Sequence, residues 1–282
     1  MSEQQRKAES IPWWLWPNLL NFDAPVVAVV WQELFARGAG VELSWPQRWL
    51  LFLAVWEVYF ADRWLDARIG RHESTERHRF HRRIGGLGWL IQAVVCVIGL
   101  GLAFQCLNRE GWLAAGAVGA ATAVWFASTH LDGAQLGWLP KEAGVGLVFA
   151  AGAALQPWAL TELPKGGLLV GAGVFAVVCI QNCASITVWE SLPTDRMDPG
   201  SFLNRWPKWA QHVGRVSLGL GVLIASVSLV HFDGEPLKAG FCAAVSLFAL
   251  GGLGLGRPAT RRRGTRILAD LALLTPLLVL AV

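Results

Sequence analysis

Runs of about 20 apolar residues recur along this chain, and each run is long enough to cross a lipid bilayer as a helix. A segment in hydrocarbon must pair its own backbone N–H and C=O groups, which a helix does within itself. The chain is 54% hydrophobic and 16% charged, whereas a soluble globular protein carries about 25% charged residues. The sequence therefore predicts an all-α polytopic membrane protein.

Short segments rich in Gly, Pro and polar residues separate the apolar runs and indicate about nine spans. The predicted spans cover residues 14–35, 47–67, 86–107, 111–131, 139–160, 167–189, 211–230, 237–256 and 266–282. No soluble domain interrupts this series. We therefore expect residues 1–282 to form a single integral membrane domain.

Basic residues are distributed unevenly between the two faces of the predicted bundle. Most Lys and Arg residues lie in the N-terminal segment and in the loops after the second, sixth and eighth predicted spans. Because cytoplasmic loops carry an excess of Lys and Arg, this pattern predicts a cytoplasmic N-terminus and an external C-terminus, and we expect a bacterial inner membrane. Orientation and membrane lipid head groups explain the net charge of +4, so we expect no nucleic-acid partner.

Asp62 and Asp66 stand four residues apart where the second predicted span meets a basic loop. This spacing places both carboxylates on one face of a helix. Acids at membrane depth are costly, and they are usually functional or paired. Carboxylate oxygens suit Mg²⁺, which also binds substrate phosphates, so the pair predicts a Mg²⁺–phosphate site. The alternative is an interfacial acid pair that Arg63 and Arg68 neutralise.

A second polar cluster closes the sixth predicted span. It consists of Asn182, Ser185 and Trp189 on one helix stripe, followed by Glu190, Asp195 and Asp198. Its acids are predicted to lie on the same membrane face as Asp62 and Asp66. The two clusters could therefore face each other across a cavity and share Mg²⁺ ions that stabilise a diphosphate leaving group. The alternative is an ordinary capped loop.

Two further basic features lie on the same predicted face. Lys141 opens the fifth predicted span, where a lysine can neutralise phosphate charge as a point cation. The run 77–83 either attracts a diphosphate or lies solvated against the membrane surface. Its histidines have no matching set of cysteines, which argues against a zinc site.

With both acid clusters and the predicted spans in view, the chain resembles the UbiA superfamily of intramembrane prenyltransferases. Members of that superfamily have nine transmembrane helices around a central cavity and two aspartate-rich motifs, after helices two and six. Asp62 and Asp66 look like the last two acids of the first motif, Asn-Asp-x-x-Asp-x-x-x-Asp. Val58 and Tyr59 stand where the opening Asn-Asp of that motif would be.

The resemblance extends to two other stretches and to the first predicted span. Asp195-Arg196, followed by Gly200, is similar to the end of the second motif, Asp-x-x-x-Asp-Arg-x-x-Gly, with Ser191 in place of its first Asp. The stretch 138–141 is similar to the Tyr-Pro-x-x-Lys region with altered spacing, and Asn21 matches the Pro- and Asn-containing first helix. These departures make the chain resemble a diverged member.

The resemblance implies transfer of a prenyl group from a prenyl diphosphate to an aromatic or other lipophilic acceptor. It implies catalytic roles for Asp62, Asp66 and Asp195, which would hold Mg²⁺ with Asp198 or Glu190. The substrate-binding residues would be Arg63, Lys141, Arg196, Asn21, Asn182, Tyr59 and Trp189. Of these, the cations would stabilise the diphosphate, and the aromatic faces of Tyr59 and Trp189 the allylic carbocation.

Two other functions are compatible with the pattern. A membrane binding or transport protein could keep the fold without the chemistry, since intramembrane polar residues also mark transport paths. A CDP-alcohol phosphotransferase also uses aspartates and Mg²⁺. However, Asp66-Ala67-Arg68 leads into Gly70 without the further acids that such a motif needs.

Overall fold

The computed structural model describes residues 12–69, 80, 84–130, 140–191, 201–256 and 262–281. Within these ranges the regular elements are all helices, so the all-α prediction is confirmed there. They are η1 Trp13–Leu15, α2 Trp16–Leu19, α3 Asp23–Gly38, α4 Trp45–Ile69, α6 Leu87–Cys106, α7 Arg109–His130, α8 Lys141–Leu160, α9 Gly166–Ser191, α10 Phe202–Arg205, η2 Pro207–His212, α11 Val213–His231, α12 Gly234–Leu255, α13 Arg262–Leu271 and α14 Leu277–Leu280.

Local sequence signals start these helices. Before α4, the Gln47 side chain accepts a hydrogen bond from the Ser44 backbone N–H at 2.7 Å, which is half of a capping box. Before α7, the Asn108 side chain accepts from the Gly111 N–H at 2.7 Å, as an N-cap residue does. These caps allow tight turns between antiparallel helices.

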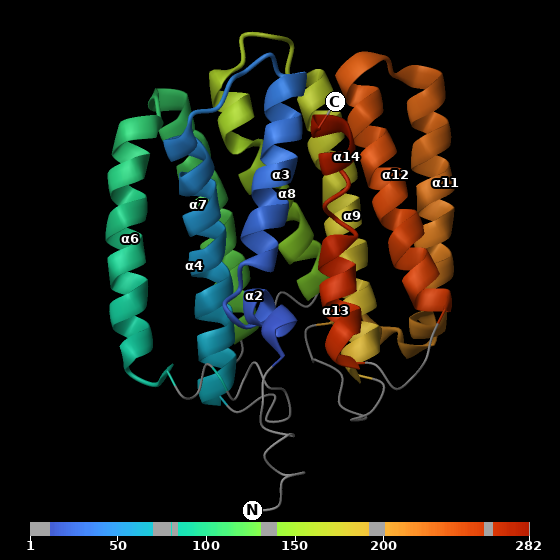
Figure 1. Ribbon diagram of the computed structural model, residues 1–282, viewed down its shortest axis with the longest axis horizontal. Coiled ribbons are helices and arrows are strands. Elements are labelled where there is room, and N and C mark those ends of the chain that lie inside the picture. Colours follow the sequence, from blue (N-terminus) through green and yellow to red (C-terminus); the bar gives the residue numbers. More distant parts are fainter. Residues whose placement is uncertain are drawn as a thin grey trace, which may run out of the picture.

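The long helices lie side by side with their axes roughly parallel or antiparallel (Figure 1). The last residues of α4, α7 and α9 and the first residues of α8 and α13 lie at one end of the bundle, together with α2 (Figure 1). We call this the lower end, as drawn. The short turns before α4, α7 and α12 lie at the upper end.

Six described helices are long and apolar enough to cross a membrane: α6, α7, α8, α9, α11 with the preceding η2, and α12. The bent pair formed by η1–α2 and α3 would make a seventh. Large apolar side chains such as Leu90, Val97 and Phe104 of α6 are exposed, as expected for a surface that faces lipid. Length and composition therefore support a helical membrane bundle with six or seven of the predicted spans.

Two predicted spans are not continuous helices. The first, 14–35, is bent by 73° between α2 and α3, where Asn21 has a positive φ of 58°. The last, 266–282, breaks between α13 and α14, just before Pro276. Proline lacks the N–H that a helix interior requires, and Asn tolerates the left-handed region better than most residues.

Side chains from neighbouring segments bind the backbone groups that these breaks leave free. The Trp56 indole N–H donates to the Leu20 carbonyl at 2.8 Å, and the Trp31 indole N–H donates to the Leu273 carbonyl at 2.8 Å. The Thr275 hydroxyl in turn donates to the Cys242 carbonyl at 2.8 Å. Non-helical backbone at membrane depth is tolerated where protein groups satisfy it in this way.

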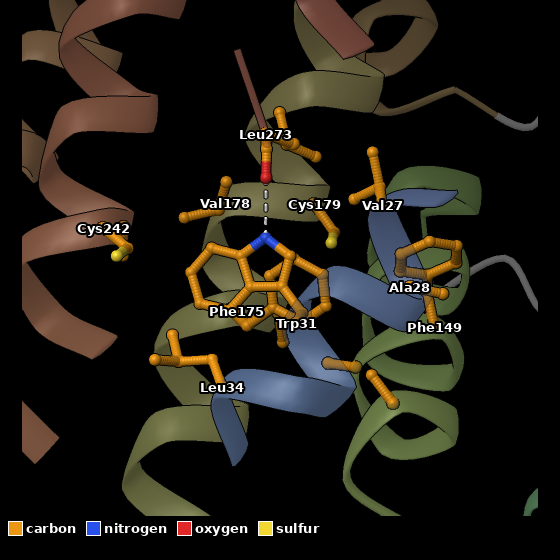
Figure 2. Close-up of a cluster of buried hydrophobic side chains, with 14 of the residues drawn as sticks. Val27, Ala28, Trp31, Leu34, Phe149, Phe175, Val178, Cys179, Cys242 and Leu273 are labelled. Carbon is orange, nitrogen blue, oxygen red and sulfur yellow. Dashed lines mark hydrogen bonds between the residues drawn. The ribbon is translucent and has the colours of Figure 1, made fainter. Parts of the chain in front are cut away.

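Trp31 is the centre of the largest hydrophobic cluster. Its ring stacks on Phe175 of α9, with 4.1 Å between ring centroids. Figure 2 shows the indole N–H pointing at the Leu273 carbonyl, with Val178 and Cys242 also around it. One side chain thus joins α3, α9 and the broken last segment.

The other part of the bundle is more open. Helix α6 packs against α4, and α7 packs against α8, where Gly144 lets the Trp125 ring approach closely because a Cβ there would lie 2.3 Å from it. Apart from the turn that joins them, the described residues of α6 and α7 scarcely contact each other. This separation leaves a cavity on the inner side of the four helices.

Candidate functional site

A cavity of about 1210 Å³ lies among α4, α6, α7 and α8 and reaches α3, α9 and α13 at the lower end. Its α4 wall extends from Leu50 to Asp66, a rise of about 24 Å at about 1.5 Å per residue. The upper wall is apolar, with side chains such as Leu107, Val118 and Leu155. The lower wall is polar and charged. The cavity therefore has the shape and polarity of an amphiphile with a charged head and a long apolar tail.

Asp62 and Asp66 lie on one face of α4, as predicted, and the His130 imidazole at the end of α7 lies against both. The His130 Nε2 is 3.5 Å from an Asp62 oxygen and 3.6 Å from an Asp66 oxygen. These distances exceed the usual range for a hydrogen bond. Within the described residues, His130 Nε2 and Asp62 Oδ1 are buried without a hydrogen-bond partner. All three side chains line the cavity.

Positive side chains surround this acid pair. Arg63 follows Asp62 directly on α4, and Lys141 begins α8; both line the cavity. Both are close enough to Asp66 to interact with it electrostatically. Two carboxylates, an imidazole and two cations therefore converge from α4, α7 and α8.

A second pair of acids lines the same cavity from α3 and α13. Asp23 and Asp270 are close enough to interact electrostatically. The Asn18 amide donates to Asp23, and the Asn182 amide donates to Asp270 at 3.3 Å. These residues come from four segments that are far apart in the sequence, so only the bundle brings them together.

Tyr59 and Arg266 connect the two groups. Tyr59 lies one turn before Asp62 and Arg63 on α4 and lines the cavity. It is within electrostatic reach of Arg63 from the first group and of Asp270 and Arg266 from the second. The two acid pairs therefore belong to one polar chamber.

Glu142 also lines the cavity, and its carboxylate makes structural contacts. It accepts a hydrogen bond from the Ser201 hydroxyl and another from the Phe202 N–H at 3.1 Å. Ser201 is the N-cap residue of α10. A carboxylate at a helix N-terminus satisfies free N–H groups there, so Glu142 fixes the start of α10 against the first turn of α8.

Six of the residues predicted for the site do line the cavity: Asp62, Asp66, Arg63, Lys141, Asn182 and Tyr59. Asn21 and Trp189 are not among its lining residues. Asn21 is buried at the break between α2 and α3. Trp189, near the end of α9, packs against both hydrophobic clusters of buried residues. Both positions are explained by packing rather than by access to the cavity.

The second predicted acid cluster falls largely outside the described residues. Asp195, Arg196 and Asp198 lie in the undescribed stretch 192–200, and of Glu190 only the helical backbone is described. In the described chain, the acids that share the cavity with Asp62 and Asp66 include Asp23 and Asp270 instead.

Sequence reasoning missed His130, Asp23 and Asp270. One signal was available, because Asp270 is a lone acid inside a predicted span, and such residues are usually functional or paired. Asp23 carried the same signal, since it stands inside the predicted span 14–35, whereas His130 stands at the end of a predicted span, where polar residues are common. Their partners lie many residues away, and only the packing of the helices identifies them.

The residues around Asp62 and Asp66 fit Mg²⁺ in part. Mg²⁺ is usually bound through one or two carboxylates, with waters and substrate phosphates completing its shell. The buried, unpartnered Asp62 oxygen is a suitable ligand atom. Among the residues that can be placed, no group of three or more His, Cys, Asp or Glu side chains is arranged to hold a metal. A Mg²⁺ ion here would therefore take its ligands from the Asp62 and Asp66 carboxylates and from a phosphorylated substrate.

The fold and the cavity place this protein in the class of helical membrane proteins that enclose an amphiphilic cavity. Searches of protein-family models, curated proteins and solved structures find no match to this chain.

Proposed function

We propose that this protein is a Mg²⁺-dependent intramembrane prenyltransferase related to the UbiA superfamily. It would transfer a prenyl group from a prenyl diphosphate to an aromatic or other lipophilic acceptor. The observation that carries the proposal is the single cavity that joins a charged lower end to a long apolar chamber. A prenyl diphosphate has the same two parts in the same order.

The charged end suits the diphosphate. Bound Mg²⁺ would supply charge that stabilises the diphosphate as it leaves. Arg63 and Lys141 add positive charge from the protein, and cations preorganised in a site that excludes water stabilise such developing charge well. Trp125 lines the same cavity, and its buried indole N–H has no hydrogen-bond partner among the described residues.

The apolar chamber suits the prenyl tail. Its walls on α4, α7 and α8 consist mainly of Ala, Val and Leu side chains, which exclude water from a reactive carbocation. Because α6 and α7 scarcely contact each other in their described residues, a tail has a lateral route from the bilayer between them. The Tyr59 ring lies at the boundary of the two zones, where an aromatic face stabilises positive charge.

The proposal includes the finer topology predicted from the sequence. In that topology α4 and the broken α13–α14 segment join the other spans to give nine. The N-terminus and the charged end of the cavity lie on the cytoplasmic side of a bacterial inner membrane. Asp195 with Asp198, or with Glu190 at the end of α9, completes the Mg²⁺ site in this proposal, and Arg196 adds charge there.

One observation favours a second function, in which the protein binds or transports the amphiphile without transferring its prenyl group. The His130 imidazole lies against both Asp62 and Asp66, where a metal ion would otherwise balance them. A protonated imidazole is a built-in counter-charge. In that case the cavity would hold its ligand without Mg²⁺.

Binding of farnesyl diphosphate to the detergent-solubilised protein tests both proposals. With Mg²⁺ present we expect binding, and with EDTA in its place we expect affinity to fall at least about tenfold, which corresponds to roughly 1.4 kcal/mol. Asp62→Asn should cause a similar loss in Mg²⁺. Glu110→Gln is the matched control, because Glu110 is an exposed acid at the upper end and pairs with Lys165.

Equal affinity in Mg²⁺ and EDTA would overturn the Mg²⁺-dependent proposal and support the binding protein. An absence of any affinity for the diphosphate in the wild type would overturn both. Release of diphosphate on addition of a phenolic acceptor distinguishes the enzyme from a binding protein.

A further inference from the structure

We propose that Asp23, Asp270 and Asn182 form a second binding site in the cavity, which takes the neutral hydroxyl group of a lipophilic acceptor. This inference deepens the proposed function, because it assigns the chemical class of the second substrate. It rests on three acceptor side chains that line one cavity and come from segments far apart in the sequence: the start of α3, the lower part of α9 and α13.

The acid pair shares one proton. Asp23 and Asp270 both line the cavity and are close enough to interact electrostatically. Two carboxyl groups that share a buried site do not both ionise, because like charges repel each other. The pair therefore carries one negative charge, and most of its remaining oxygen capacity is for accepting hydrogen bonds.

Asn182 supplies a third acceptor. Its Nδ2 donates to Asp270, and this fixes the orientation of the amide, since an Asn oxygen cannot donate. Its Oδ1 is buried and has no hydrogen-bond partner among the described residues, in a residue that is only 7% exposed and lines the cavity. A buried acceptor without a partner costs about 1–3 kcal/mol, so this oxygen indicates a ligand group that donates.

Charge at the site selects a neutral donor. Arg266 lies one turn before Asp270 on α13, lines the cavity, and is close enough to Asp270 to interact electrostatically. Its positive charge balances the single negative charge of the acid pair. A hydroxyl group then satisfies the acceptors without adding charge, whereas a carboxylate would meet three acceptor oxygens and an ammonium group would leave excess positive charge.

The test compares probe molecules that differ only in the donor. p-Hexylphenol donates one hydrogen bond, and its methyl ether, p-hexylanisole, donates none. Isothermal titration calorimetry of the detergent-solubilised wild-type protein should show at least about tenfold tighter binding of the phenol, since a hydrogen bond to a charged group contributes that much or more. p-Hexylbenzylamine, which is cationic, should bind more weakly than the phenol.

Three variants locate the effect. Asp270→Asn keeps the shape of the side chain while the charge is lost. Asn182→Ala removes the unpartnered oxygen. Both should reduce the preference for phenol over anisole to about twofold or less. Glu110→Gln is the control, because Glu110 is an exposed carboxyl that pairs with Lys165 and is not among the lining residues of the cavity, and it should keep the full preference.

Each outcome decides the inference. Equal binding of phenol and anisole by the wild type overturns it, and this comparison needs no variant to fold. Persistence of the preference in both Asp270→Asn and Asn182→Ala also overturns it, provided that their melting curves match the wild type. Tighter binding of the amine than of the phenol overturns the assignment to a hydroxyl group. If the phenol preference holds but farnesyl diphosphate does not bind, the prenyltransferase proposal fails and the hydroxyl site stands.

Discussion

The two halves of this bundle are built from similar apolar helices, yet one is packed and the other is hollow. The packed half consists of α3, α9, α11 and α12, the hollow half of α4, α6 and α7, and α8 packs against both. Half of the apolar stretch of α8, of α9 and of α12 is buried within the protein (50%), against 22% for α11 and 11% for α6 and for α7. The packed half contains large rings and close backbone contacts. In the hollow half, α6 and α7 expose most of their surface to lipid or to the cavity. Apolar composition alone therefore does not distinguish a helix that holds the fold from one that encloses a ligand.

The contrast has a physical basis. In lipid there is little hydrophobic gain from joining two apolar helices, so association depends on close packing and interhelical hydrogen bonds. The packed half supplies both, through Trp31 on Phe175 and the Trp31 bond to Leu273. The helix faces that line the cavity make fewer such packing contacts and hydrogen bonds, because they face the cavity and not another helix.

The largest expected effect on stability is that of Trp31→Ala. This change removes a fully buried ring, its stacking on Phe175 and a hydrogen bond to a broken helix. We expect a loss of about 3–5 kcal/mol, measured as a fall in thermal stability in detergent. Trp112→Ala is the comparison in the hollow half, since that ring lines the cavity and is 38% exposed. It should cost less than about 1 kcal/mol. Equal losses would remove the distinction between the halves.

The next effect is expected at Glu142, where the lower end of the cavity is fixed. Glu142→Ala leaves the Ser201 hydroxyl and the Phe202 N–H without their acceptor. Hydrogen bonds to a buried charged group contribute about 1.5–3 kcal/mol, so thermal stability should fall by about that amount. Glu110→Ala removes an exposed ion pair instead and should cost less than about 1 kcal/mol. A negligible effect of Glu142→Ala would mean that this contact does not hold the cavity end in place.

A smaller loss is expected from a glycine in the packed half. A Cβ on Gly240 of α12 would lie 1.9 Å from the Ser228 hydroxyl oxygen of α11, so these helices must move apart. Gly240→Ala should destabilise the protein by about 1–3 kcal/mol. Gly252→Ala lies on the same helix, and nothing lies within 4 Å of a Cβ there. This control should be neutral or slightly stabilising, and a matching loss in both variants would exclude close packing as the cause.

The smallest effect on stability, with the largest effect on ligand binding, is expected in the hollow half. Gly119 of α7 lines the cavity, and nothing lies within 4 Å of a Cβ there. Gly119→Leu should leave thermal stability within about 0.5 kcal/mol of wild type. It should weaken binding of farnesyl diphosphate more than binding of its shorter homologue isopentenyl diphosphate, because the leucine fills tail space.

Gly116→Leu provides the matched control for that prediction. Gly116 lies on the same helix, is also open around its Cβ, and is not among the lining residues of the cavity. It should change neither stability nor tail-length preference. If both leucines weaken long-chain binding equally, the apolar chamber is not where the tail lies.

The helical membrane fold followed directly from the sequence. Apolar runs of about 20 residues have few alternatives to membrane helices, because every backbone group in hydrocarbon must be paired within the protein. The placement of Asp62 and Asp66 on one helix face was also predictable, since α-helical periodicity requires it. Pro276 and Asn21 are local signals for the breaks after α13 and α2, but the side chains that bind the freed backbone groups belong to distant segments and could not be identified from the sequence.

The composition of the polar chamber was decided by tertiary structure. His130, Asp23 and Asp270 acquire their partners only when α3, α4, α7 and α13 pack into one bundle. Likewise, helices of similar apolar composition form a packed half and a hollow half. The physical reason is that local sequence fixes backbone pairing and the face on which a side chain lies. Which faces meet depends on the summed packing of all helices, and no single segment encodes that sum.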